Sequence, residues 1–171
     1  GAADWLQTAT QAYRGHDYPA AVAAYRHAAD LGDATAQTSL GWMYANGLGL
    51  SRDYAQAARW YHAASQQNFQ WAQVGLGLLY DDGLGVQRDP AQAQAWYLKA
   101  AEQGNHVAQS NLGRLQANGK DYVQAARWYR LAAEQGDAMA QFSLGLLYSQ
   151  GQGVPQDQQQ AAAWWQRAAG Q

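Results

Sequence analysis

The sequence predicts an all-α fold, a right-handed α-solenoid of about five antiparallel helix pairs, from two patterns that recur together. The dipeptide Leu-Gly returns at positions 40–41, 76–77, 112–113 and 144–145, at spacings of 36, 36 and 32 residues. An aromatic pair keeps step with it, as Trp-Tyr at 60–61, 96–97 and 128–129 and as Trp-Trp at 164–165. A period in the thirties is typical of stacked supersecondary units whose apolar faces are buried only by their neighbours.

Each unit is expected to contain two helices joined by a glycine-containing turn. Apolar side chains at helical spacing, such as Ala36, Leu40 and Tyr44, mark a first helix. First helices are expected near residues 2–14, 33–46, 69–82, 105–118 and 137–150. Second helices are expected near residues 17–31, 53–67, 89–103, 121–135 and 157–170. The units then span residues 2–32, 33–68, 69–104, 105–136 and 137–171 of a single repeat array.

Local signals define the helix ends. An Asp stands three residues before a Gln at 53/56, 89/92, 121/124 and 157/160, which is the pattern of a capping box at the start of a second helix. Left-handed residues are expected to end second helices at Gly32, Asn68, Gly104 and Gly136. The glycine of each Leu-Gly pair lies inside a helix, where Gly costs about 1 kcal/mol relative to Ala. We therefore expect it to permit close approach of the paired helix.

Composition excludes several classes of function. The net charge is −2 and no run of Lys or Arg exists, which argues against a nucleic-acid partner. No stretch approaches the roughly 18 to 20 apolar residues that a membrane span requires. The absence of Cys excludes disulfides, thiolate zinc sites and cysteine nucleophiles. The chain begins with Gly, which fits either a trimmed secretion signal or an engineered start.

The segments LGWMYANGLGLSRDYAQAARWYHAA at 40–64 and LGLLYDDGLGVQRDPAQAQAWYLKAAEQG at 76–104 resemble the Sel-1-like repeat, a relative of the tetratricopeptide repeat. AAEQGDAMAQFSLGLLYSQGQGV at 132–154 is similar to the same family. The turns at 15–17 and 119–121 are shorter than in that pattern and look tetratricopeptide-like. The resemblance implies a bacterial adaptor that binds proteins along a concave surface. It also slightly favours a periplasmic or otherwise exported location, with a cytoplasmic one left open.

The sequence offers no catalytic residues, metal ligands or cofactor site. The four His form no i, i+3 or i, i+4 pair, so exposed imidazoles are the favoured interpretation. The glycine-rich turns that begin at Gly47 and Gly83 lack a Lys-Ser or Lys-Thr ending and recur with the repeat, which favours structural turns over phosphate cradles. Neither a Gly-x-Ser-x-Gly elbow nor a Ser-x-x-Lys pair appears. We therefore expect that the protein is not an enzyme and uses no cofactor.

The eight Trp residues fall into two groups. Those at 60, 96, 128 and 164 follow the period and are expected in the core, whereas Trp5, Trp42 and Trp71 do not. The columns of Trp42 and Trp71 lie away from the Leu40/Tyr44 stripe and are expected on the concave first-helix face. The candidate partner-binding residues are Trp42, Trp71, Val74, Leu78, Arg114, Phe142 and Leu146. Packing between neighbouring first helices is the alternative role for the same columns.

These observations predict a non-enzymatic protein–protein interaction scaffold or adaptor that binds a protein or peptide on its first-helix face. Three alternatives remain open. The resemblance allows an immunity protein that neutralises a secreted bacterial toxin. A glycan-binding module has support only from Asp81 and Asp82 beside Trp71. Self-association through the C-terminal end would follow if Trp164-Trp165 lies on an uncapped helix pair.

Overall fold

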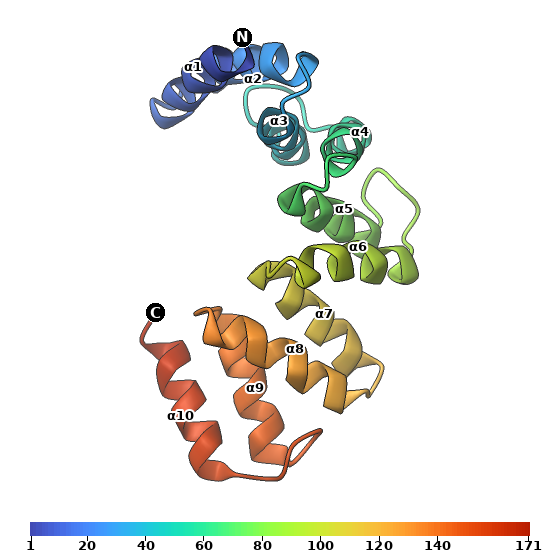
Figure 1. Cartoon of the computed structure of the whole chain (residues 1–171), viewed down its shortest axis with the longest axis vertical. Helices are drawn as coiled ribbons and strands as arrows, with labels where there is room; N and C mark the ends of the chain where they lie inside the picture. Colours follow the sequence, from blue (N-terminus) through green and yellow to red (C-terminus); the bar gives the residue numbers. More distant parts are fainter. The chain divides into compact units, whose positions relative to one another are not determined.

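The computed structural model describes all residues, 1–171, and consists of ten α-helices without a strand (Figure 1). The helices are α1 (Ala2–Arg14), α2 (Tyr18–Asp30), α3 (Ala34–Asn46), α4 (Tyr54–Ser65), α5 (Gln70–Asp82), α6 (Pro90–Glu102), α7 (His106–Asn118), α8 (Tyr122–Glu134), α9 (Ala138–Gln150) and α10 (Gln158–Ala169). All ten predicted helices are present, with ends within two residues of those expected. The predicted all-α repeat fold is confirmed.

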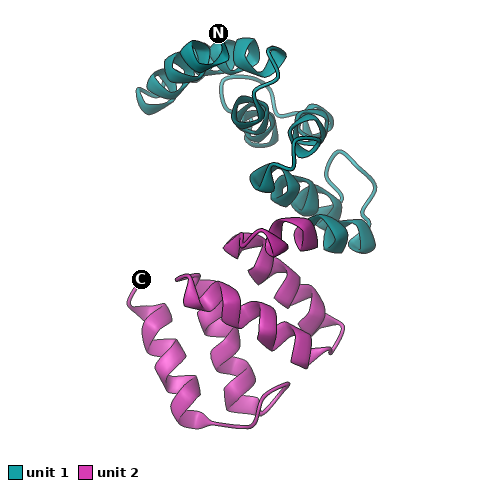
Figure 2. Cartoon of the chain, in the orientation of Figure 1, with its two compact units in different colours: residues 1–96 teal, residues 97–171 magenta.

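The chain divides into two compact units, residues Gly1–Trp96 and Tyr97–Gln171, and the division falls within α6 (Figure 2). In the first unit, α2 contacts both α1 and α3, and α4 contacts both α3 and α5. In the second unit, α8 contacts both α7 and α9, and α9 contacts α10. A second helix therefore packs against its own first helix and against the first helix that follows, as stacked repeats require.

The ring of Tyr61 shows how this stacking is achieved in the first unit. It projects from α4, is buried, and fits between Gly41 of α3 and Gly75 of α5. A methyl group added at Gly41 would stand 2.8 Å from the ring, and one added at Gly75 would stand 2.7 Å from it. The expected close approach at the Leu-Gly glycine is confirmed here. Gly75 is a second contact of the same kind, which the repeated dipeptide does not reveal.

The second unit uses the same arrangement. A methyl group added at Gly113 of α7 would stand 2.7 Å from the ring of Tyr129 on α8. Gly145 of α9 faces the indole of Trp165, whose Nε1 donates to the carbonyl oxygen of Phe142 at 3.2 Å. Trp165 therefore occupies the position of the repeated Tyr. Its indole N–H also donates a hydrogen bond to α9, which a ring carbon of Tyr at the same place could not donate.

The second helices begin at the predicted Asp residues, but the predicted capping boxes are only half formed. The carboxylate of Asp53 accepts a hydrogen bond from the backbone N–H of Gln56 at 3.1 Å. The backbone N–H of Asp53, which a capping-box side chain would accept, instead donates to the carbonyl oxygen of Tyr44 at 2.9 Å. The same bond joins Asp157 to Tyr148 at 2.9 Å. A tertiary bond to the preceding helix thus replaces the local bond to Gln.

Left-handed residues end the helices as predicted. Gly32, Gly104 and Gly136 have φ values of 91°, 94° and 96°, and Asn68 has a φ of 59°. The short turns at 15–17 and 119–121 also contain a left-handed residue each, namely His16 and Lys120, which the sequence analysis did not anticipate.

The glycine-rich turns are structural, as the sequence favours. A methyl group at Gly49 would stand 2.5 Å from the carbonyl oxygen of Tyr18, the first residue of α2. Gly85 lies in the same way against Tyr54, the first residue of α4. Each of these turns therefore lies against the start of the preceding second helix, and only glycine permits that distance with a positive φ.

Buried glutamines tie the helices together, and the sequence analysis missed them. The amide nitrogen of Gln37 donates to the carbonyl oxygen of Ala29 at 3.2 Å, and its amide oxygen accepts from Gln67 at 3.3 Å. In the second unit, Gln109 accepts from Gln135 at 2.8 Å. Gln residues recur at these positions, but a polar residue in a helix is ordinarily read as exposed. Their role becomes visible only when the backbone carbonyl of the preceding helix is in place.

Candidate functional site

The first helices of the first unit expose three of the predicted partner-binding residues. Trp42 of α3 is 43% exposed, and Trp71 and Leu78 of α5 are 47% and 41% exposed. Trp42 is held on one side by the ring of Tyr13 of α1, which meets it edge-on at a centroid distance of 6.2 Å. α3 and α5 contact each other directly, so these side chains extend from a packed surface.

Val74 was predicted on the same face, and that prediction is wrong. The side chain is buried, with 4% of its surface exposed. Val74 lies about one helical turn before Leu78 on α5. Neighbouring first helices such as α3 and α5 contact each other. A small β-branched side chain in such a position is covered by its neighbours, whereas a larger one would extend beyond them. Val74 therefore contributes to packing between repeats, the alternative role that the sequence left open.

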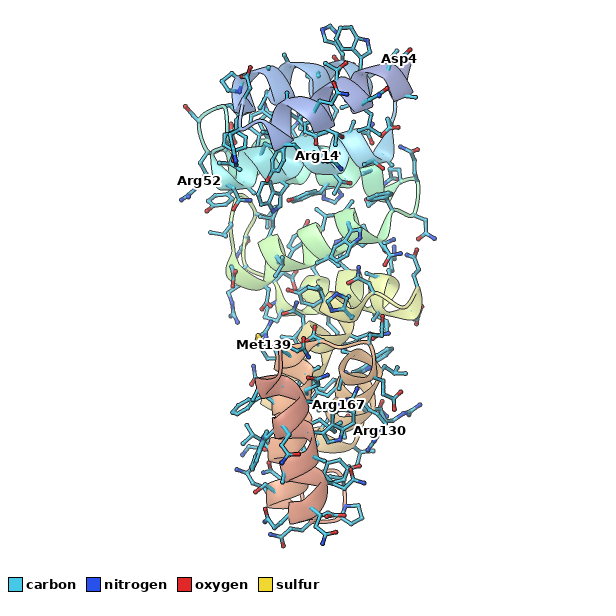
Figure 3. The ribbon with its side chains drawn as sticks, turned by 90° about the vertical axis from the view of Figure 1, so that its left-hand side faces the viewer. Asp4, Arg14, Arg52, Arg130, Met139 and Arg167 are labelled. Atoms are coloured by element: carbon cyan, nitrogen blue, oxygen red, sulfur yellow. The ribbon has the colours of Figure 1, made fainter.

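The second unit exposes an apolar row along α9. Met139, Phe142 and Leu146 are 71%, 53% and 37% exposed, at spacings of three and four residues that place them on one side of the helix. Figure 3 shows Met139 at the start of α9, with its side chain directed away from the ribbon. Two of these residues were predicted, and Met139 was not singled out. An exposed row of this kind is the type of surface that another protein covers.

Beside this row lies a pocket of about 260 Å³ that contains the predicted residue Arg114. Its lining comes from α7, α8 and α9, together with Asp137, the N-cap residue of α9. The lining residues are Val107, Ser110, Asn111, Arg114, Tyr129, Asp137, Met139 and Ser143. The pocket thus combines apolar groups with hydroxyl, amide, guanidinium and carboxylate groups within one unit.

The charged groups of the pocket differ in how they are held. Both carboxylate oxygens of Asp137 are engaged: one accepts from the backbone N–H of Ala140 at 2.9 Å, and the other lies 2.9 Å from Nδ1 of His106. Arg114 Nη2 donates to the amide oxygen of Asn111 at 3.4 Å. Burial raises the pKa of Tyr129, while Ser143 and the positive charge of Arg114 act in the opposite direction. The phenol is therefore a neutral wall of the pocket at physiological pH.

Trp71 lies at the start of α5 and Asp81 and Asp82 lie at its end, about 15 Å away along the helix, so the structure does not bring these residues together. Asp81 is buried, with only 8% of its surface exposed. Asp82 is exposed, and the two carboxylates therefore do not face solvent together. No group of three His, Asp or Glu side chains is arranged to hold a metal ion.

The C-terminal helix pair is better covered than its sequence suggests. Trp164 is buried in the core of the second unit. The guanidinium carbon of Arg167 lies 4.4 Å from the centroid of the Trp164 ring, and both residues belong to α10 (Figure 3). Arg130 of α8 covers the ring of Tyr148 in the same way at 5.5 Å. Cationic side chains therefore lie over aromatic rings that would otherwise be apolar contact surface.

None of the ten helices is long and apolar enough to cross a membrane.

The pocket could not be read from the sequence, although one of its residues was selected. Asn111 and Ser143 were not singled out. Both occupy the column of Gly75, where small and polar residues alternate. Asn111 stands three residues before Arg114, on the same side of the helix, and this spacing is the sequence signal that could have indicated the pocket. The position of Asp137 depends on how α9 begins against α7, which a sequence pattern does not report.

Comparison with known proteins places the chain in a family. The Sel1 repeat model matches residues 34–69, 72–105, 106–137 and 138–171. A solved Sel1 repeat protein from Oxalobacter formigenes is 35% identical, with a TM-score of 0.89, and the match covers 98% of this chain and 68% of that one. A protective antigen of uropathogenic Escherichia coli strains with an SLR fold is 37% identical, with a TM-score of 0.84 over 90% of this chain. This chain spans only 34% of the length of that antigen.

More distant structures share the fold alone. An immunity protein from Pseudomonas aeruginosa is 18% identical, with a TM-score of 0.51 over 95% of this chain. No match is found among the curated proteins. Four consecutive family repeats cover residues 34–171 with one gap at residues 70–71, and their helix pairs are those of the structure. The chain therefore belongs to the Sel1 repeat family.

Proposed function

We propose that this protein is a non-enzymatic scaffold that binds a protein or peptide partner through the exposed side chains of its first helices. Sel1 repeat proteins generally mediate protein–protein interactions, on a repeat scaffold that is not catalytic. The observation that carries the proposal is the distribution of exposed aromatic rings. Trp5, Trp42, Trp71 and Phe142 are the exposed aromatic side chains, and all four lie on first helices.

The second helices provide the contrast. They also expose large apolar side chains, namely Leu98, Val123 and Leu131, but carry no exposed Trp, Tyr or Phe. Trp and Arg are enriched among the residues that dominate binding energy, whereas Leu and Val are under-represented there. An aromatic side chain carries about 150 to 250 Å² of surface that a partner can cover. The first-helix faces are therefore the favoured interface.

The chemistry of the exposed groups supports a binding role over a catalytic one. The pocket in the second unit contains one guanidinium and one carboxylate, and the carboxylate already has two hydrogen-bond partners. A general base or a nucleophile needs a partner that raises its reactivity and a place for the substrate beside it. No such pair of groups stands out among the exposed residues.

A capture experiment tests the proposal. The wild-type chain and a Trp42→Ala/Trp71→Ala variant are immobilised at equal density, and bound proteins from native cell extract are quantified by mass spectrometry. The matched control is Val123→Ala/Leu131→Ala, which removes exposed apolar groups from a second helix. If the two Trp residues are binding hot spots, their loss costs 2 kcal/mol or more and reduces partner affinity by about 30-fold. Recovery should be unchanged in the control.

The result separates the possible outcomes. Circular dichroism and thermal unfolding of each variant establish that the fold is retained. A partner lost equally from both variants, or retained by both, would contradict binding at the first-helix face. A single stoichiometric partner lost only from the Trp variant would support the proposal, and a toxin as that partner would specify an immunity role.

A further inference from the structure

We propose that the pocket lined by α7, α8 and the start of α9 binds the carboxylate of a peptide ligand, with an apolar side chain of the ligand seated beside it on α9. This inference rests on the proposed function, since it specifies the chemistry of the partner. It concerns the second unit alone and is independent of the Trp residues in the first unit.

The size of the pocket indicates part of a chain rather than a cofactor. Its volume of about 260 Å³ lies below the roughly 300 to 1,000 Å³ typical of small-molecule and cofactor sites. One or two side chains of a longer ligand fill such a volume. The exposed Met139 forms part of the pocket lining, so a peptide can continue from the pocket onto the surface.

The polar groups of the pocket are mainly hydrogen-bond donors to an anion. Arg114 supplies a planar fork of N–H donors, which matches the two oxygens of a carboxylate. Ser110 and Asn111 lie on the same side of α7, four and three residues before Arg114, respectively. Ser143 adds a hydroxyl from α9. The amide nitrogen of Asn111 already donates one hydrogen bond to the carbonyl oxygen of Val107 at 3.0 Å, and Ser143 is hydrogen-bonded to Tyr129. The second N–H of the Asn111 amide and the hydroxyl of Ser110 can orient a carboxylate that the guanidinium attracts.

Asp137 is the group that argues against an anion, and its contacts explain why it does not exclude one. One of its oxygens caps α9 through Ala140 N–H, and the other lies 2.9 Å from the imidazole of His106. Both acceptors are therefore engaged within the protein. Along α7, Val107 and Arg114 are separated by seven residues, or about 10 Å at the rise of an α-helix. The Nη2 atom of Arg114 donates to the amide oxygen of Asn111 at 3.4 Å, one turn back along α7, whereas His106, which contacts Asp137, is the first residue of the helix.

The charge balance favours a carboxylate over a phosphate. Arg114 is the one permanent cation in the lining, and the negative charge of Asp137 is nearby. A phosphate group carries about −1.5 to −2 charges at neutral pH and is normally bound by a cluster of cations. A monovalent carboxylate needs only the single guanidinium.

The apolar row supplies the second part of the recognition. Phe142 and Leu146 continue along α9 from Met139, and all three are exposed. The ring of Phe142 lies beside the indole of Trp165, with a centroid distance of 6.5 Å, and its backbone carbonyl oxygen accepts a hydrogen bond from Trp165 at 3.2 Å. An apolar ligand residue next to the carboxylate would cover this row. The expected ligand is thus an acidic group adjacent to a large apolar side chain.

Nuclear magnetic resonance with matched peptides tests the inference. The full-length, ¹⁵N-labelled chain is titrated with the N-acetylated, C-amidated tetrapeptide Ala-Leu-Asp-Ala, and then with the same peptide containing Asn or phosphoserine in place of Asp. The C-amidated and free-acid forms of acetyl-Ala-Leu distinguish a side-chain carboxylate from a chain terminus. We expect saturable shifts at Ser110, Asn111, Ser143 and the Arg114 side chain, with binding at least fivefold weaker for the Asn peptide.

Variants complete the test. Arg114→Gln should weaken binding of the carboxylate peptides at least fivefold, and Arg114→Lys, which keeps the charge without the fork, should weaken it less. Arg127→Gln on the exposed side of α8 is the control and should bind as the wild type does. Equal binding of the Asp and Asn peptides, tighter binding of phosphoserine, or unchanged binding by Arg114→Gln would overturn the inference. If these peptides fail while Trp42→Ala/Trp71→Ala still abolishes partner capture, this inference fails and the proposed scaffold function stands.

Discussion

Replacing Gly75 by Ala should destabilise the protein, although the same change stabilises most helices. Gly75 lies within α5, where Ala is favoured over Gly by about 1 kcal/mol. The new methyl group would stand 2.7, 2.8 and 2.9 Å from three atoms of the Tyr61 ring. Overpacking of this kind costs about 1 to 3 kcal/mol. The net loss of folding free energy is therefore about 0 to 2 kcal/mol.

The decisive measurement is whether the effect of Gly75→Ala on the folding free energy changes from destabilising to stabilising when the ring of Tyr61 is removed. The three atoms nearest to the added methyl group all belong to Tyr61, so Tyr61→Ala removes the clash. In that background, Gly75→Ala should stabilise the protein by about 1 kcal/mol, because only the helix propensity remains. In the control background Tyr61→Phe, which keeps the ring, Gly75→Ala should remain destabilising.

Urea unfolding followed by circular dichroism measures the free energies of the six proteins in this comparison. Since repeat arrays can depart from two-state unfolding, native-state hydrogen exchange of the amides in α4 and α5 provides a local measurement. Tyr61→Ala itself is expected to cost about 3 to 5 kcal/mol, as for other buried aromatic residues. Stabilisation by Gly75→Ala in the wild-type background would refute the role assigned to the close contact.

Three further changes test the core, the buried glutamines and the buried phenol. Leu76→Ala should cost about 2 to 5 kcal/mol because the side chain is fully buried, whereas Leu78→Ala, at an exposed position, should stay within about 0.5 kcal/mol in the same urea experiment. Gln109→Ala should cost about 1 to 3 kcal/mol, since the amide of Gln135 and a buried backbone carbonyl each lose a partner. Burial raises the pKa of Tyr61, so the unfolded chain ionises first above about pH 10 and the stability present below that pH is lost as pH rises. Tyr61→Phe should lessen this alkaline loss in unfolding experiments between about pH 9 and 11, and an unchanged pH profile would contradict it.

The helices could be predicted closely because their signals are local. Asp53 and Asp157 start their helices with the expected side-chain bond, and Gly32 and Asn68 take the expected left-handed conformation. The second half of each capping box could not be predicted, because the N–H of Asp53 finds the carbonyl of Tyr44 on the preceding helix. A local sequence pattern shows which backbone groups need a hydrogen-bond partner. It does not show which group of another helix supplies that partner.

The candidate site was predicted in part for a similar reason. Trp42 and Leu78 share a column that lies away from the Leu40/Tyr44 stripe, so their exposure follows from that column. Val74 is small enough to be covered, and its burial depends on the distance between first helices. That distance depends on contacts such as that of Tyr61 with Gly41 and Gly75, which joins α3, α4 and α5.

Comparing the repeats distinguishes the positions that maintain the fold of this chain from the positions that could recognise a partner. Columns that every unit must fill in the same way, such as those of Leu40 and Gly41, are fixed by contacts between helices and carry little information about a partner. The column of Trp42 contains Leu78, Arg114 and Leu146 in the other units, and no contact common to the units requires these different side chains. A scaffold assembled from near-identical pairs can vary such a column without loss of stability. The single guanidinium in that column is therefore the position where a change of residue should alter the choice of ligand most and the fold least.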